Sequence, residues 1–211
     1  MPDLQAARGA SLSTSASSDS PSASAAGSVR RRGATRLALA VAAGGLLVDL
    51  GSKQLAVQEL TGKPPVEVLG SFLTLRLIRN PGAAFSAGAS VTPVISVVAI
   101  VATVVVVWFA LRVRHRGWAV ALGLLLAGVT GNLVDRLFRA PGPLRGHVVD
   151  FFALPNWPIF NVADICIDLA GALFVLLLFR GVRLDGTRHQ DDEGPTASPT
   201  PSSPATREAT T

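Results

Sequence analysis

Charged residues are scarce in this chain of 211 residues: Asp, Glu, Lys and Arg make up 16% of it, against roughly 25% in soluble globular domains. Apolar residues make up 49%, and they are concentrated between residues 36 and 183, because both ends are rich in Ser, Ala, Thr, Pro and charge. This distribution excludes an ordinary soluble domain and indicates a small integral membrane protein. Cys166 is the single cysteine, which excludes a disulfide scaffold.

Several patterns of catalytic and cofactor-binding proteins are also missing. The three histidines are scattered, and there is no H-E-x-x-H zinc motif, no P-loop and no G-x-G-x-x-G. A G-x-S-x-G nucleophile elbow is absent, as is the G-x-G-D pattern of one group of intramembrane aspartyl proteases. We therefore expect no metal and no cofactor.

Four stretches have the roughly 20 mostly apolar residues that a membrane-spanning helix needs. We place them at about 37–57, 92–111, 117–137 and 160–179. The second is rich in valine but too long for a buried strand. The predicted fold class is therefore a mainly α membrane protein, a bundle of four transmembrane helices.

The basic residues predict how the bundle is oriented. Twelve of the 19 Lys and Arg residues fall on the side that holds both ends and the loop between the second and third spans, and five fall on the other side. By the positive-inside rule, both termini are cytoplasmic. This placement also argues against nucleic acid as the reason for a pI near 10.9. A cleaved signal peptide is the alternative for Arg30–Arg32 and the apolar run after it, but that run continues past the candidate site Ala40–Ala42.

The remaining segments are the two ends and two outer loops. We expect residues 1–35 and 184–211 to be disordered cytoplasmic extensions of a membrane domain at 36–183. In the outer loop 58–90, the segments 66–69 and 72–78 are β-prone and are followed by the turn Asn80-Pro81-Gly82, which predicts a small extramembrane β element. The second outer loop, 139–159, is proline-rich, and we place its Trp157 at the headgroup level.

Carboxylates within apolar spans are costly, and they are functional candidates by default. Asp49, Asp135 and Asp164 lie about 20 to 28 Å above the cytoplasmic ends of their spans at roughly 1.5 Å per residue. They therefore share one depth towards the outer side, and Asp150, in the outer loop, approaches from above.

Structural roles are the alternative for some of these acids. Asp49 and Lys53 stand four residues apart and can pair on one helix face. Asp135 and the adjacent Arg136 can reflect snorkelling at the interface. Asp168 has no assigned partner, and we expect a structural or supporting role.

Asp150 and Asp164 are the stronger candidates for a catalytic pair, because each has apolar neighbours and no adjacent basic residue. Two buried carboxyl groups brought together share a proton and titrate as a pair. One can then act as base on a water molecule while the other, protonated, donates to a carbonyl oxygen. The spacing permits this aspartic-protease chemistry but does not show that the two side chains meet.

Five blocks, in this order, resemble the lipoprotein signal peptidase family, also called signal peptidase II. They are DLGSK at 49–53, NPGAAFS at 80–86, GNLVDRL at 131–137, VVDFF at 148–152 and FNVAD at 160–164.

The resemblance implies an aspartic endopeptidase that cleaves the signal peptide from bacterial prolipoproteins just before the diacylglyceryl-modified cysteine. It places the catalytic pair on Asp150 and Asp164. The other motif positions, implied to bind substrate or support the pair, are Asp49, Lys53, Asn80, Gly82, Asn132, Asp135, Arg136, Asn161 and Ala163. The long Ser/Pro-rich ends and Asp168 fall outside the family pattern.

The resemblance also implies a multi-pass protein of the bacterial inner (cytoplasmic) membrane, with its site towards the outer face. The expected partners are diacylglyceryl-prolipoproteins and membrane lipid, with no nucleic acid and a monomeric chain. A proton-coupled carrier is the main rival, since intramembrane aspartates also serve proton relays. A non-catalytic assembly protein is the second rival.

Overall fold

The computed structural model describes residues 23–82 and 91–185. Its elements, in order, are α1 (Ala23–Leu60), β1 (Val66–Leu69), β2 (Leu73–Asn80), α2 (Thr92–Ala110), α3 (Arg116–Phe138), β3 (Val148–Ala153) and α4 (Val162–Phe179). Most of the predicted disordered ends, and residues 83–86 of the second motif block, lie outside the described residues.

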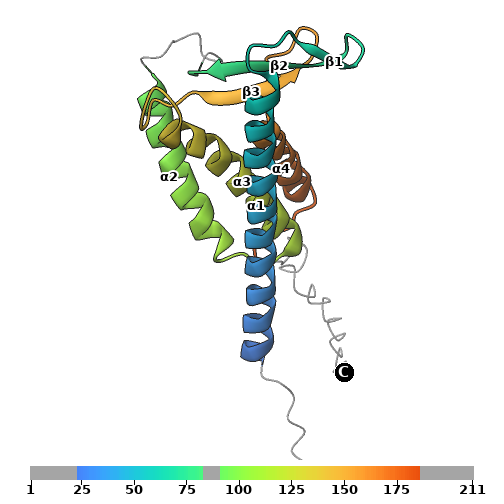
Figure 1. The fold of residues 1–211 in the computed structure, drawn as a ribbon. Helices are drawn as coiled ribbons and strands as arrows, with labels where there is room; N and C mark the ends of the chain where they lie inside the picture. The colour runs from blue at the N-terminus through green and yellow to red at the C-terminus, as the bar shows by residue number, and fades with distance from the viewer. Residues whose placement is uncertain (1–22, 83–90, 186–211) are drawn as a thin grey trace, which may run out of the picture.

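The prediction of four spans is confirmed. Within the described residues, four helical segments are long and apolar enough to cross a membrane, namely 31–60, 92–110, 116–138 and 162–179. The helices pack as a bundle with the sheet across one end (Figure 1). One boundary differs, because α1 begins at Ala23 and so overlaps the segment 1–35 that was predicted to be disordered. Alanine and arginine are good helix formers, and the helix continues beyond its apolar part.

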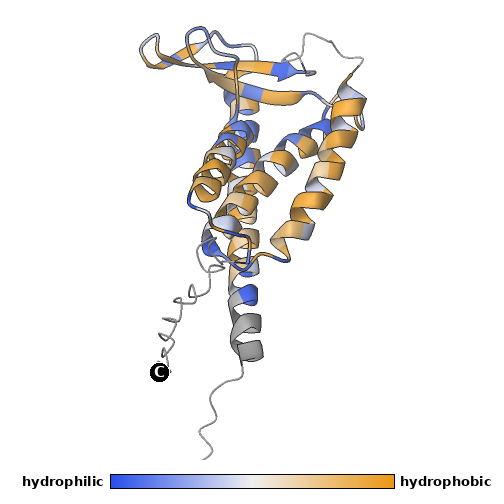
Figure 2. Cartoon of the chain, turned by 180° about the vertical axis from the view of Figure 1, so that it is seen from behind, coloured by the Kyte–Doolittle hydropathy of each residue, from blue (hydrophilic) through white to orange (hydrophobic). Residues whose placement is uncertain are grey.

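Helix α3 lies at the centre of the bundle and packs against the other three helices. Small residues allow this close contact. A Cβ at Gly123 would lie 2.6 Å from the carbonyl oxygen of Ala38 in α1, and one at Gly128 would lie 2.4 Å from that of Ala163 in α4. By contrast, α2 and α4 consist mostly of hydrophobic residues (Figure 2), and some of these are exposed, among them Val98, Val104 and Leu178. Such an exterior suits a surface that faces lipid.

The predicted β element is present, but it is larger than expected. Strands β1 and β2 pair antiparallel, and β3 joins them from the second outer loop to give the order β1-β2-β3. This third strand was not predicted, because a six-residue run bounded by irregular segments carries little periodic signal. Val149 and Phe151 of β3 pack with Ala56 and Leu60 of α1, so that the sheet rests on the end of the bundle.

Candidate active site

Strand β3 places Asp150 beside β2. Asp150 lies opposite Ile78 in the register, and Asn80 is two residues further along β2, so both point to the same face of the sheet. The side-chain amide of Asn80 donates to Asp150 Oδ2 at 2.9 Å. Asp150 is only 3% exposed, although it belongs to a strand outside the membrane-spanning helices.

Asp164 is held at the first turn of α4. Asn161 caps this helix: its side chain accepts a hydrogen bond from the Asp164 amide at 3.1 Å, and Asp164 Oδ2 accepts one from the Asn161 amide at 3.1 Å. This reciprocal capping box satisfies two free N–H groups of the helix start, where a negative charge is also favoured. It leaves Asp164 Oδ1 free to accept a hydrogen bond from Asn132 Nδ2 at 2.8 Å.

Two asparagines connect the two aspartates. Asn161 Nδ2 donates to Asp150 Oδ1 at 2.6 Å, and its backbone amide donates to Asp164. Asn161 Nδ2 also donates to Asn132 Oδ1 at 3.2 Å, while Asn132 donates to Asp164. Asp150 and Asp164 therefore belong to one hydrogen-bond network, and their charges interact.

A buried lysine lies behind this network. Lys53 Nζ is 2.8 Å from Asp49 Oδ2 and 3.0 Å from Asp135 Oδ2, and it donates to Asn132 Oδ1 at 3.0 Å. The expected pairing of Asp49 with Lys53 is therefore present. A buried charge needs such partners, because leaving it unpaired is costly.

The two acids paired with Lys53 fasten the elements that carry the candidate pair. Asp49 Oδ1 accepts a hydrogen bond from the Ala163 amide of α4 at 2.8 Å, and Asp135 Oδ2 accepts one from the Val149 amide of β3 at 3.1 Å. Asp49 and Asp135 thus bind the backbone amides that directly precede Asp164 and Asp150, respectively.

Two arginines near the site, Arg136 and Arg139, have surroundings that differ from those expected from the sequence. Arg139 pairs with Asp135 one helical turn earlier; only the i,i+4 spacing signalled this pair. Arg136 does not snorkel outward but is buried at 8% exposure. Its Nη1 has no hydrogen-bond partner within the described residues, and Arg136 lines the cavity described below.

The carboxyl group of Asp150 has a perturbed proton affinity. Burial raises its pKa from 3.8 to about 6, and the nearby charge of Asp164 acts in the same direction. The hydrogen bonds from Asn80 and Asn161 oppose this shift, because they stabilise the ionised form. Asp150 is therefore a carboxyl group that holds a proton at a mildly acidic pH.

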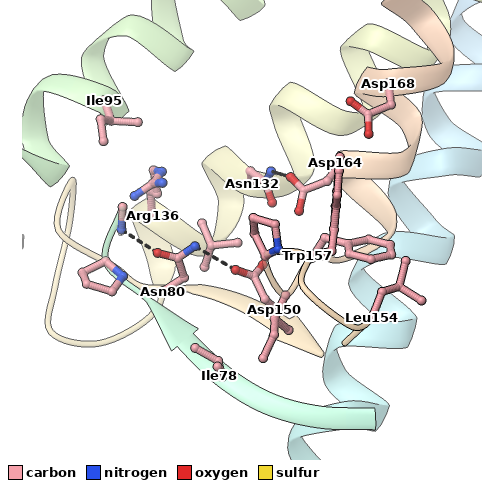
Figure 3. Close-up of a pocket in the computed structure, with 16 residues that line it drawn as sticks. Ile78, Asn80, Ile95, Asn132, Arg136, Asp150, Leu154, Trp157, Asp164 and Asp168 are labelled. Atoms are coloured by element: carbon pink, nitrogen blue, oxygen red, sulfur yellow. Dashed lines mark hydrogen bonds between the residues drawn. The ribbon is translucent and has the colours of Figure 1, made fainter. Parts of the chain in front are cut away.

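A cavity of about 890 Å³ brings these groups together. Asp150 and Asp164 both line it, and Figure 3 shows Asn80, Asn132 and Arg136 around them. Apolar side chains form much of the remaining wall, among them Ile95, Leu154 and the exposed Trp157. No group of three or more His, Cys, Asp or Glu side chains in the described part of the chain is arranged to hold a metal ion.

The structure thus brings together the residues expected at the site. The cavity is lined by Asn80, Gly82, Asn132, Arg136, Asp150 and Asp164, and also by Asp168. Gly82 donates its backbone N–H to Asn80 Oδ1 at 2.8 Å and has a φ of 119°, which favours glycine. The other residues expected at the site lie behind the cavity wall: Asp49, Lys53, Asp135, Asn161 and Ala163.

Comparisons with known proteins agree with this architecture. A sequence profile described as signal peptidase (SPase) II matches residues 41–180. The lipoprotein signal peptidase of Streptomyces griseus is 48% identical over 153 residues, which are 72% of this chain and 78% of that protein. That of Mycobacterium tuberculosis is 45% identical over 158 residues, 74% of this chain and 78% of that protein.

A solved structure shares the fold. It is described as a bacterial membrane enzyme determined by the in meso method at 1.9 Å resolution, and it superposes with a TM-score of 0.60 at 26% identity. The match covers 68% of this chain and 92% of that one. From the profile, the relatives and the shared fold, we conclude that this multi-pass membrane protein belongs to the signal peptidase II family.

Proposed function

We propose that this chain is an aspartic endopeptidase that removes the signal peptide from diacylglyceryl-modified prolipoproteins, cleaving before the lipidated cysteine. One observation carries the proposal: Asp150 and Asp164 line the same cavity and are held by amide donors rather than by cations. Neither carboxylate forms an ion pair within the described residues. Such a pair can hold one proton between two acids, which is the state that acid–base hydrolysis requires.

The mechanism assigns the proton to Asp150, whose pKa is about 6. Asp164 takes a proton from a water molecule, whose oxygen bonds to the scissile carbonyl carbon, and Asp150 donates its proton to the carbonyl oxygen. Asp164 then passes its proton to the amide nitrogen as the C–N bond breaks. The tetrahedral intermediate returns a proton to Asp150 as the new carboxyl group forms.

The surrounding residues support this chemistry in two ways. Asn80, Asn132 and Asn161 fix the orientations of the two carboxyl groups. Arg136 has a buried N–H group without a partner in the described part of the chain, and we assign it to donate to a substrate carbonyl oxygen. An unsatisfied donor of this kind gains more from a ligand than an already paired one does.

We further propose that a monomeric chain lies in the bacterial cytoplasmic membrane with both termini inside and the site near the outer leaflet. The distribution of Lys and Arg supports this orientation. The sheet beside the site and the described start of α1 lie at opposite ends of the bundle (Figure 1). We take residues 36–183 as the peptidase domain, with the profile match at 41–180 inside it.

A gel-shift cleavage assay tests the function. The purified protein in detergent is incubated with a diacylglyceryl-modified prolipoprotein, beside the variants Asp150→Asn and Asp164→Asn. Glu59→Gln serves as the matched control, because it removes an exposed carboxylate on α1 outside the cavity. We expect cleavage by the wild type and the control, loss of cleavage in both aspartate variants, and no effect of EDTA.

Two results would contradict the proposal. If the wild type leaves a competent substrate uncut, the function is wrong, and proton flux in proteoliposomes would then favour a carrier. If a variant that carries both Asp150→Asn and Asp164→Asn still cuts, the aspartic mechanism is wrong.

A further inference from the structure

Asp168 is a second carboxylate on the face of α4 that carries Asp164. It lies one helical turn beyond Asp164 and lines the same cavity. Within the described residues its carboxylate has no hydrogen bond and no ion pair. Asp168 is exposed and lines the cavity, and an unpaired acid in a membrane-spanning helix is a functional candidate by default.

The position of Asp168 defines which part of a substrate it faces. At roughly 1.5 Å per residue, it is about 6 Å further along α4 than Asp164, away from the sheet, as Figure 3 shows. If the proposed function holds, the signal peptide reaches the aspartates from within the membrane, and its residues before the scissile bond extend deeper than the bond itself. Asp168 lies on that deeper side.

The substrate needs hydrogen-bond acceptors there. A peptide must be extended around the bond that is cut, so its backbone N–H groups lose their helical partners, and in lipid each of them must find another acceptor. The carboxylates of Asp150 and Asp164 already accept hydrogen bonds from asparagine amides, and Asn132 Oδ1 already accepts from Lys53 and Asn161.

We propose that Asp168 is a substrate-binding residue whose carboxylate accepts a backbone N–H from the signal-peptide residues just before the scissile bond. This inference rests on the proposed function. In this proposal Asp168 contributes to the affinity for the extended signal segment, whereas Asp150 and Asp164 carry out the proton transfers.

The test pairs two variants with modified substrates. Asp168→Leu removes the acceptor at similar size and suits a lipid-facing helix, and Asp168→Asn retains an acceptor oxygen. The substrates are synthetic diacylglyceryl lipopeptides in which an ester replaces the amide N–H of one of the three residues before the cysteine. Leaving the amide of the cysteine itself intact keeps the scissile bond unchanged.

We expect one ester to raise the KM of the wild type about tenfold, the lower range for a hydrogen bond to a charged group. The same ester should change the KM of Asp168→Leu less than about twofold, because the interaction is already lost and the two changes are not additive. Asp168→Asn should remain sensitive to that ester, and Asp168→Leu should keep its kcat and pH profile.

Two results would overturn the inference. One is equal sensitivity to every ester in the wild type and in Asp168→Leu. The other is a shifted pH profile with an unchanged KM in Asp168→Leu, which would mean that Asp168 acts through the charge of Asp164. Failure of the wild type to cut the unmodified lipopeptide would instead contradict the proposed function, so the two failures are distinguishable.

Discussion

The hydrogen bond from Asn80 to Asp150 allows a prediction in which the pH dependence of the enzyme moves in a defined direction. Asn80 Nδ2 donates to Asp150 Oδ2 at 2.9 Å. This hydrogen bond stabilises the ionised carboxylate and so opposes the rise in pKa that burial causes. Asn80→Ala removes the donor. The protonated form of Asp150 should then persist to higher pH, so its pKa should rise above the value of about 6.

The size of the shift follows from the strength of the bond. A hydrogen bond to a charged group contributes roughly 1.5–3 kcal/mol, and one pKa unit corresponds to about 1.4 kcal/mol. The lower end of this range predicts a rise of about one unit. If Asp150 donates its proton in the reaction, the alkaline limb of kcat/KM should move from about pH 6 to about pH 7, even though the maximal rate falls.

The assay is kcat/KM for a fluorogenic diacylglyceryl lipopeptide in detergent, measured from about pH 4.5 to about pH 8.5. Thr74→Val on the same strand is the matched control, because Thr74 is neutral and lies outside the cavity; its profile should match that of the wild type. An alkaline limb that stays in place in Asn80→Ala, or moves to lower pH, would refute the assignment of the proton to Asp150.

Two further predictions concern stability. Lys53→Met leaves the buried carboxylates of Asp49 and Asp135 without their shared cation. Breaking a buried pair in this way should lower the free energy of unfolding by about 3–5 kcal/mol. Denaturation in mixed micelles measures this loss, and an unchanged midpoint would contradict the prediction. In Gly131→Ala the new Cβ would lie 2.4 Å from Asp49 Oδ2, so we expect a destabilisation of about 1–3 kcal/mol as a lower melting temperature. Gly171→Ala is its control, because a Cβ there meets nothing within 4 Å; equal melting temperatures of the two variants would refute the clash.

The sequence was sufficient for features that depend on local pattern. Twenty-residue apolar runs predict spans because the bilayer sets their length, and all four are present. Carboxylates with apolar neighbours are costly to bury, so Asp150 and Asp164 stood out before any contact was known. The pairing of Asp49 with Lys53 was also accessible, since four residues bring two side chains to one helix face.

Only the tertiary structure decided what each acid contacts. Strand β3, which carries Asp150, pairs with β2 from the other outer loop, and a short strand has no detectable period of its own. Lys53 lies between Asp49 and Asp135 because α1 and α3 pack together. This ion pairing distinguishes Asp49 and Asp135 from the pair of aspartates in the cavity. Burial and hydrogen bonding depend on neighbours distant in the chain, so the role of a buried charge follows from packing rather than from its place in the sequence.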